Sequence, residues 1–486
     1  MIESLRGLGY SAPTAIADLI DNSISAGAGR VDLLFHWEGS HSHIRILDDG
    51  DGMNDPELDK AMRLGERSPK DSRASGDLGR FGLGMKTASF SQCRRLTVAS
   101  KKDGTTSCLR WDLDVLARSE DNGWHLLEGP HPGSSHLLEV LGNSAGTLVV
   151  WEEMDRIVAP GFMEQDFLDL MDRVEQHLAM VFHRYLEGTS PKLGLTINGR
   201  PIAPWDPFLA RHPATSSSPV ERIPTASGIV EAQWHVLPHK DKLDPRTHES
   251  SGGRDGWTAQ QGFYVYRNER LLLAGSWLGL GQGRPWSKEE AYRLARIRVD
   301  IPNTADEDWR IDIRKSVARP PVAIRMRLTR LAEDAREHAR RVFAHRGQTG
   351  RGRQQSVIQA WRVDRSDYGI RYRIDESHPA IKGVMDEAGP LLPALKAMLR
   401  VIEETVPVQR IWLDTTEAHE TPRTGFSGEP AGEIAAVLGA VFRNLVERRG
   451  YQPEEARERL IKTEPFNNFP ELVRALGKPR TEGDRP

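Results

Sequence analysis

Hydrophobic residues follow helical spacing in residues 14–26, near the start of the chain. In the stretch TAIADLIDNSISA, apolar side chains recur at Ile16, Leu19, Ile20 and Ile24. These positions lie on one stripe of a helix. The pattern therefore predicts a helix with one buried face.

Short apolar runs predict that strands follow this helix. The candidates are residues 31–37, 43–48, 94–101, 107–114, 136–141 and 146–154. Residues 54–78 are polar and broken by Pro56, Pro69 and Gly76, which predicts a mobile loop around short helices. Strands with helices packed on one face form an α+β sandwich, so this is the fold class we expect for the first third of the chain.

A second α/β unit is predicted beyond a long helical pattern at residues 162–187. Its strand candidates are KLGLTING, GIVEAQWHVL, GFYVYRNERLLLAG and ARIRVDIP. A polar loop is expected at residues 244–260 and a basic helix from about 319 to 346. The stretch GQTGRGRQQS has the composition of a linker. We predict four segments: residues 1–160, 161–345, a linker at 346–375, and a mainly helical region at 376–486.

Length and composition limit the class of protein. A chain of 486 residues is too long for one core, which favours two or three domains. No run of 18 apolar residues occurs, and the N-terminus lacks the layout of a signal peptide. Only Cys93 and Cys108 are present, too few for a disulfide framework or a zinc cluster, and both are expected to be buried. We therefore expect a cytoplasmic protein without a membrane segment.

The net charge of −3 indicates no strong pull of the whole chain on nucleic acid. A local basic segment runs from Arg325 to Arg353. It contains Arg325, Arg327, Arg330, Arg336, Arg340, Arg341, Arg346, Arg351 and Arg353. It is a candidate contact for the DNA phosphate backbone. A solvated helix face followed by a flexible linker is the alternative.

The first motif with chemical potential is Asp18-Leu19-Ile20-Asp21-Asn22 on the predicted helix. Asp18 and Asn22 are four residues apart and therefore share one face. A carboxylate there can orient a water molecule, while an amide oxygen one turn later can ligate a hard cation such as Mg²⁺. Taken alone, the pair is a weak signal, because Asp and Asn on a helix usually just face solvent.

The second motif, DDGDGM at residues 48–53, follows a predicted strand. A carboxylate at a strand end can accept a hydrogen bond from an exocyclic amino group such as that of adenine. Gly50 and Gly52 let the backbone turn tightly against a planar ligand, and Met53 offers a soft apolar wall. A plain loop is the alternative. A calcium loop would require a bidentate Glu that the sequence lacks at the required offset.

The third motif is GRFGLGMK at residues 79–86. Free backbone N–H groups at a glycine turn that opens a helix form an anion site, and Lys86 would add a point charge. The motif is not a Walker loop, which requires GK[ST]. It also lacks the context of a dinucleotide fingerprint.

Together with Gly146-Thr147 at the head of a later strand, these motifs resemble the GHKL ATPase superfamily. That superfamily includes the DNA gyrase B subunit, the 90-kDa heat-shock chaperone, histidine kinases and MutL. The resemblance covers roughly residues 10–155, and AIADLIDNS and GRFGLGMKTAS are most similar to MORC-type and MutL-type proteins. It implies a Bergerat-type ATPase sandwich followed by a ribosomal-S5-like α/β transducer domain.

The resemblance also implies ATP and Mg²⁺ as ligands and gives roles to individual residues. Asp48 would bind the adenine amino group with support from Thr147, and Asn22 would ligate Mg²⁺. Asp18 would be the catalytic base, and Lys315 in RIDIRKSV would reach the γ-phosphate, with Arg314 as the alternative. Lys315 could also be a surface lysine without a role in the site. The remaining nucleotide contacts would be Gly50, Gly52, Met53, Ser68, Lys70, Gly79, Arg80, Phe81, Gly82, Leu83, Gly84 and Lys86.

Asp18 departs from the family pattern, because the base is usually Glu. The shorter side chain would hold the carboxylate about 1 Å further from the water, and misplacement of that size costs on the order of 100-fold in rate. ATP binding is therefore better supported by the sequence than rapid turnover.

Two uses of ATP are consistent with the sequence. The first is a homodimeric clamp that closes on DNA when ATP binds, in prokaryotic DNA repair or phage defence, with operon-encoded protein partners. The alternative is a chaperone-like or protein-binding switch whose partner surface is the C-terminal third. A histidine kinase is disfavoured, because no His lies on a dimerisation helix before the ATPase region.

Overall fold

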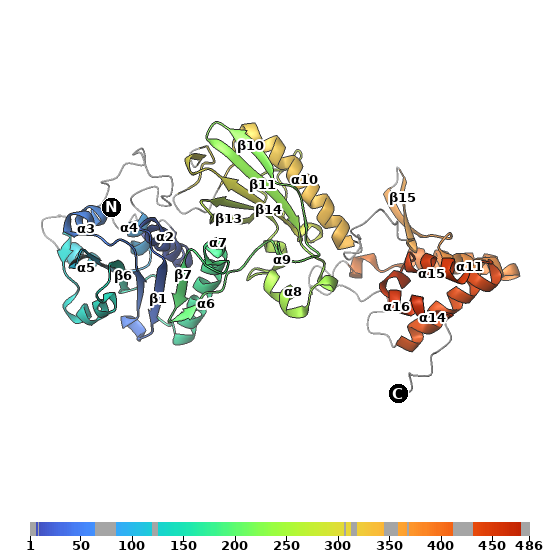
Figure 1. The fold of residues 1–486 in the computed structure, drawn as a ribbon, viewed down its shortest axis with the longest axis horizontal. Coiled ribbons are helices and arrows are strands. Elements are labelled where there is room, and N and C mark those ends of the chain that lie inside the picture. Colours follow the sequence, from blue (N-terminus) through green and yellow to red (C-terminus); the bar gives the residue numbers. More distant parts are fainter. Residues whose placement is uncertain are drawn as a thin grey trace. The chain divides into compact units, whose positions relative to one another are not determined.

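The computed structural model describes residues 6–7, 9–63, 84–118, 125–305, 308–312, 318–344, 358–366, 369–411 and 431–477. The chain divides into two compact units, residues 1–348 and 349–486 (Figure 1). The first unit contains two mixed sheets with helices packed on them, which confirms the predicted α+β class. Among the described residues, no helix combines the length and apolar content needed to cross a bilayer.

The first sheet has eight strands in the order β5-β4-β3-β6-β2-β1-β7-β8. Neighbouring strands are antiparallel except β1 and β7, which run parallel. The strands are β1 (Arg30–His36), β2 (His43–Asp48), β3 (Arg95–Lys102), β4 (Thr105–Asp112), β5 (Leu127–Glu128), β6 (Gly146–Glu152), β7 (Gly194–Ile197) and β8 (Arg200–Pro201). The sequence pattern had placed β7 in the second α/β unit. Pairing with β1 makes it part of the first sheet instead.

Helix α2 (Ala12–Ser25) packs against α4 (Gly84–Phe90) and α6 (Glu164–Val181) on one face of this sheet (Figure 1). Ser11 Oγ accepts a hydrogen bond from the Thr14 N–H, and Pro13 lies in the first turn, so the predicted helix begins two residues earlier than expected. Ile16, Leu19 and Ile20 of its apolar stripe are buried, and Ile24 near its end is half-buried.

Three shorter helices complete this part of the chain. They are α3 (Asp55–Met62), α5 (Leu113–Arg118) and α7 (His183–Leu186). The long helical pattern predicted at residues 162–187 corresponds to α6 and α7.

Residues 136–141, predicted as a strand, belong to the 3-10 helix η2 (Pro132–Leu141). Ser134, Leu137 and Leu141 are buried at spacings of three and four residues, whereas Glu139 is exposed. A strand would place Glu139 on the same buried face as Leu137 and Leu141, so this pattern is that of a helix. The two leucines pack on Ala99 and Leu148, where they form a second, smaller core cluster of the sheet. The strand prediction was therefore wrong, because the apolar run is too short to separate the two periods.

The second sheet has the order β10-β11-β14-β12-β13, with β9 paired to β11. Helix α10 (Val322–Ala344) packs on β11 and β14. The strands are β9 (Ser216–Ser217), β10 (Glu221–Thr225), β11 (Gly228–Val236), β12 (Gly262–Arg267), β13 (Arg270–Ser276) and β14 (Ala295–Ile301). Strands β12 and β14 are parallel.

The segment predicted as a polar loop at residues 244–260 contains two short helices, α8 (Pro245–Ser251) and α9 (Gly256–Ala259). Asp244 accepts a hydrogen bond from the Thr247 N–H at 3.0 Å, and Pro245 opens the first turn of α8. These are start signals of a helix. Few apolar residues accompany them, and for this reason the hydrophobic pattern missed both helices.

The second unit contains several helices and the hairpin of β15 (Trp361–Ser366) and β16 (Gly369–Ile374). This hairpin lies within the residues predicted as a linker, and the four-segment division of the chain stays a prediction. The helices are α11 (Pro379–Glu387), α12 (Leu392–Thr405), α14 (Ala431–Arg443), η7 (Asn444–Arg448), α15 (Pro453–Ile461) and α16 (Pro470–Ala475). A separate core forms around Leu438, Leu445 and Leu460.

Candidate active site

Asp48 lies at the end of β2, where its carboxylate is held by three donors. Oδ2 accepts from the Ser23 hydroxyl at 2.7 Å, and Oδ1 accepts from the N–H groups of Gly50 and Thr147, both at 3.1 Å. Burial raises the pKa of the Asp48 carboxyl, while the three donors oppose that rise. The side chain is therefore fixed in direction before any ligand arrives.

Ser100 of β3 joins the neighbours of Asp48 into one network. Its hydroxyl oxygen lies 2.9 Å from Thr147 Oγ1 and accepts a hydrogen bond from the Met53 N–H at 2.8 Å. Sequence reasoning missed both Ser100 and Ser23. Ser23 directly follows the Asp18–Asn22 motif, which could have marked it. Ser100 stands opposite Thr147 across β3 and β6, a relation that only the strand register reveals.

Two glycines allow the backbone to approach this network closely. A Cβ on Gly52, whose φ is 68°, would lie 2.0 Å from the Lys101 carbonyl oxygen. A Cβ on Gly146 would lie 2.1 Å from the Asp48 carbonyl oxygen. No side chain fits at either position. The turn after Asp48 and the first residue of β6 can therefore approach the neighbouring backbone this closely only with glycine.

Helix α2 carries Asp18, Asp21 and Asn22, and it lies next to Asp48 because Ser23 of the same helix donates a hydrogen bond to the Asp48 carboxylate. Asn22 is exposed, whereas Asp18 and Asp21 are buried. The exposed amide oxygen of Asn22 is a hard donor that, together with phosphate oxygens, fits the few protein ligands that Mg²⁺ takes.

Asp18 and Asp21 face Arg270 of β13, which lies far along the chain. Arg270 Nε lies 3.2 Å from both carboxylate oxygens of Asp21, and Nη2 lies 3.6 Å from Asp18 Oδ1. Arg270 was not predicted from the sequence, because no local motif contains it.

Lys86, predicted as a phosphate contact, is buried on α4 and donates hydrogen bonds to the carbonyl oxygens of Ala61 and Arg63. Gly84 forms the first residue of the same helix. The other predicted residues of the GRFGLGMK motif, from here on called the glycine box, lie outside the described part of the chain. The same holds for the predicted nucleotide contacts between α3 and this motif and for the predicted γ-phosphate cations. These are Ser68, Lys70, Gly79, Arg80, Phe81, Gly82, Leu83, Arg314 and Lys315.

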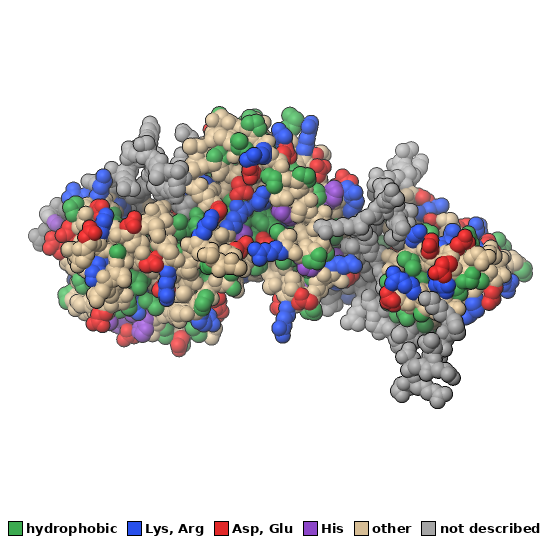
Figure 2. Space-filling model, in the orientation of Figure 1, with side chains coloured by type: hydrophobic (Ala, Val, Ile, Leu, Met, Phe, Trp, Pro, Cys, Tyr) green, Lys and Arg blue, Asp and Glu red, His purple; other side chains and the backbone are tan. Residues whose placement is uncertain are grey.

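The basic segment predicted to contact DNA falls mainly on α10. Arg336 is buried and stacks on Tyr292, with 3.6 Å from its Cζ to the ring centroid, so it is not available to a phosphate. The exposed arginines of this helix are Arg325, Arg327, Arg330, Arg340 and Arg341. Figure 2 shows basic side chains along this helix with acidic ones between them. Arg346, Arg351 and Arg353 lie outside the described residues.

A cluster elsewhere has the residue types of a metal site. His183, Glu187 and Asp206 place ligand atoms within 4.8 Å of one another. The oxygens of Asp206 already accept hydrogen bonds from the N–H groups of Phe208 and Ala210 at 2.8 and 3.0 Å. His183 bridges Glu187 and the Tyr266 hydroxyl. These bonds indicate a structural network of the first unit.

Comparison with known proteins agrees with this geometry. Residues 10–147 match the family described as histidine kinase-, DNA gyrase B- and HSP90-like ATPase. The chain is 32% identical over 96 residues to ATPase morc-1 of Caenorhabditis elegans, covering 20% of this chain and 11% of that protein.

Two further relatives point the same way. Mouse ATPase MORC2B is 26% identical over 199 residues, which are 39% of this chain and 19% of MORC2B. The DNA mismatch repair protein MutL of Paramagnetospirillum magneticum is 34% identical over 106 residues, which are 21% of this chain and 16% of MutL. The matches thus span less than a fifth of each of these three relatives.

Proposed function

We propose that the chain binds ATP with Mg²⁺ and hydrolyses it slowly. Residues 10–147 match the histidine kinase-, DNA gyrase B- and HSP90-like ATPase family, and parts of the chain are similar to MORC ATPases and to MutL. The observation that carries this proposal is the Asp48 carboxylate, fixed by Ser23, Gly50 and Thr147 at the end of β2.

The hydrogen bonds of Asp48 leave room for an adenine amino group. An ionised carboxylate offers about four acceptor sites, and three donors occupy it in the structure. One site therefore remains for the exocyclic N–H of the base. Met53 is half-buried beside it and offers an apolar wall, while Gly50 and Gly52 keep the turn free of side chains.

Asp18 and Asn22 would act on the phosphate end of the nucleotide. Mg²⁺, held by Asn22 and phosphate oxygens, would offset the negative charge of the phosphates. Asp18 would orient the attacking water as general base. Lys315 would stabilise charge on the γ-phosphate, and the residues Ser68, Lys70 and 79–84 would close over the nucleotide. Lys86 would join them only by giving up its hydrogen bonds to the carbonyl oxygens of Ala61 and Arg63.

Hydrolysis is proposed to be slow because Asp18 is one methylene shorter than the Glu usual at this position. The structure adds that Asp18 is buried, with the Tyr10 hydroxyl donating to Oδ2 at 3.0 Å. A carboxylate held in this way has little freedom to reach further toward a water molecule.

We further propose that ATP closes a homodimeric clamp on DNA, in the cytoplasm of a prokaryote and in DNA repair or phage defence, with operon-encoded partners. The support is the similarity to MutL, a DNA mismatch repair protein, and the exposed arginines of α10. AMP-PNP with Mg²⁺ should convert monomer to dimer in light scattering. A mass that stays monomeric at every nucleotide concentration would contradict the clamp.

A second candidate is a protein-binding switch without DNA. It is favoured by α12, none of whose residues is buried. Met398, Val401 and Ile402 are among its exposed apolar side chains. DNA binding measured against salt separates the two candidates. The clamp requires an affinity that falls steeply as salt rises, whereas no binding even at low salt favours the switch.

Nucleotide binding is tested by calorimetry with Mg²⁺ and ATP or AMP-PNP. Asp48→Asn replaces an acceptor by a donor opposite the adenine amino group. Loss of a hydrogen bond to a charged group costs about 1.5–3 kcal/mol, so the affinity should fall by roughly tenfold or more. Asp51→Asn is the matched control, because Asp51 is an exposed acid of the same turn. Wild-type protein that gives no heat with ATP, or an Asp48→Asn variant with wild-type affinity, would disprove the nucleotide site.

A further inference from the structure

We propose that Arg270 is a positioning residue for the Asp18 carboxylate, so that ATP hydrolysis depends on the second sheet being docked against α2. The inference rests on the proposed ATPase function. It adds a residue outside the ATPase domain to the machinery that orients the attacking water.

The three nitrogens of the Arg270 guanidinium each face a different partner. Nε lies 3.2 Å from both Asp21 oxygens, and Nη1 donates to the Leu271 carbonyl oxygen at 2.7 Å. Nη2 is left to face Asp18 Oδ1 at 3.6 Å. Because the guanidinium is planar and rigid, fixing Nε and Nη1 also fixes where Nη2 lies.

All three charged side chains are buried. The exposed fractions are 3% for Arg270, 1% for Asp21 and 5% for Asp18. Buried charges of this kind hold a defined geometry, since moving one removes an opposite charge from the others in a buried site. Asp21 alone would be enough to dock Arg270 on α2. The additional approach of Nη2 to Asp18 is what assigns Arg270 a role at the reacting carboxylate.

Asp18 is held from its other side by Tyr10. The Tyr10 hydroxyl donates to Asp18 Oδ2 at 3.0 Å. Burial, followed by the charge of Asp18, raises the pKa of the Tyr10 phenol, so it remains a donor at neutral pH. Tyr10 is also hydrogen-bonded to Thr87 of α4, the helix that begins within the glycine box. The Asp18 carboxylate is thus clamped between the glycine-box helix and the second sheet.

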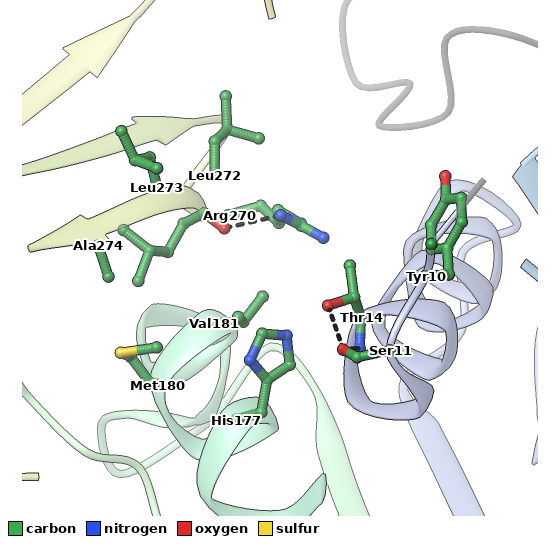
Figure 3. Close-up of a pocket in the computed structure, with 12 residues that line it drawn as sticks. Tyr10, Ser11, Thr14, His177, Met180, Val181, Arg270, Leu272, Leu273 and Ala274 are labelled. Carbon is green, nitrogen blue, oxygen red and sulfur yellow. Dashed lines mark hydrogen bonds between the residues drawn. The ribbon is translucent and has the colours of Figure 1, made fainter. Parts of the chain in front are cut away.

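A cavity of about 300 Å³ lies beside this clamp. Figure 3 shows Arg270 reaching from β13 toward α2 across it, with His177 of α6 and Ser11 and Thr14 of α2 in the wall. Burial, aided by the Arg270 charge, lowers the pKa of His177 to about 4, so this ring adds no positive charge to the cavity wall at neutral pH. Arg270 is one of the residues that line this cavity, so its side chain borders open space as well as the two carboxylates.

The test compares Arg270→Gln and Arg270→Lys with wild type, using calorimetry for the ATP dissociation constant and phosphate release for kcat. Misplacing a catalytic group by about 1 Å costs on the order of 100-fold. Arg270→Gln should therefore lower kcat by at least about tenfold, while the ATP dissociation constant stays within about threefold. Arg270→Lys keeps the charge but not the fork, so its kcat should lie between those of Arg270→Gln and wild type.

The matched control is Arg296→Lys. Arg296 is equally buried on β14, but its guanidinium donates to the carbonyl oxygens of Pro207 and Ser251 and not to α2. Its variant should keep the wild-type kcat. Thermal unfolding of each variant separates loss of fold from loss of orientation. If Arg270→Gln does not fold, the split between kcat and affinity must appear in Arg270→Lys.

Three outcomes would overturn the inference. The first is a folded Arg270→Gln with kcat within twofold of wild type, and the second is a folded Arg270→Lys with full activity where Arg270→Gln does not fold. The third is a parallel fall of kcat and ATP affinity. Wild-type protein that binds no ATP overturns the proposed function together with this inference, whereas active wild type with an unaffected Arg270→Gln overturns the inference alone.

Discussion

Beside Asp48, two stretches of backbone approach each other more closely than any side chain permits. Gly52 has a φ of 68° and its missing Cβ would collide with the Lys101 carbonyl oxygen. Gly52→Ala should therefore lower the free energy of unfolding by about 1–3 kcal/mol for the steric clash, in addition to the cost of the left-handed backbone. Urea titration of the purified variant measures this.

The control for that prediction is Gly104→Ala. Gly104 has a φ of 81°, but a Cβ there would meet nothing within 4 Å. Its variant carries only the conformational cost, about 1–2 kcal/mol. Equal losses of stability in Gly52→Ala and Gly104→Ala would show that the close approach to Lys101 is not a constraint.

Asp18 supports a second prediction about a single residue. Asp18→Asn keeps the shape of the side chain but removes the basic carboxylate, and general bases contribute about 100- to 10,000-fold to rate. The variant should lose at least about 100-fold in kcat and keep its affinity for ATP. Phosphate release and calorimetry measure the two quantities, with Asp169→Asn on the exposed face of α6 as control. Full activity in Asp18→Asn would require another base.

The sequence predicted the site residues that lie inside local motifs and missed those that meet only in three dimensions. Asp48 and Thr147 were found because a motif and a strand head mark them, and the structure pairs them across β2 and β6. Arg270 lies 249 residues from Asp21 along the chain, and no periodicity or motif connects the two. Its position becomes visible only when β13 is placed beside α2.

At the scale of elements, the hydrophobic pattern succeeded where one face is buried over a long stretch. Helices α2 and α10 and strands β2 and β6 fall at or within a few residues of their predicted positions. The pattern failed for short elements. Helix η2 was taken for a strand, and α8 and α9 for a loop, since a few apolar residues do not distinguish a period of 2 from one of 3.6. Strand β7 was recognised but assigned to the wrong sheet, because pairing partners are set by tertiary packing.

Helix α10 is the element on which the DNA proposal can be tested. Changing Arg325, Arg330 and Arg340 together to Gln removes three exposed positive charges. Each lost phosphate contact should reduce the slope of log affinity against log salt by about 0.9, or about 3 for three contacts. Fluorescence anisotropy with duplex DNA at several salt concentrations measures the slope.

The matched control for α10 is the pair Arg327→Gln and Arg341→Gln. Arg327 is already paired with Glu221, and Arg341 lies 3.2 Å from Glu337. These two arginines should contribute less to a phosphate contact. DNA affinity that is unchanged in the triple variant would remove α10 from the proposed interface and favour the protein-binding switch.

At the scale of the whole molecule, the two sheets of the first unit share a sensitivity to acid. His43 of β2 and His235 of β11 are buried, and burial is the largest cause that lowers the pKa of each to about 4. The ordinary value is 6.5. The unfolded chain therefore binds these protons at a higher pH than the folded chain does.

The sign of the pH effect follows from this difference. Because the pKa of each histidine is lower in the folded chain, the stability that each contributes is fully present above pH 6.5. It is lost as the pH falls from 6.5 toward about 4. Within that window, each should reduce the free energy of unfolding by about 1.4 kcal/mol per pH unit. His235→Gln should reduce the slope of the free energy of unfolding against pH by about 1.4 kcal/mol per pH unit. Substitution of the exposed His41 is the control and should leave this slope unchanged. Urea titrations at pH 7, 6 and 5 measure the slope, and an identical slope in wild type and His235→Gln would show that His235 is not held neutral by its burial.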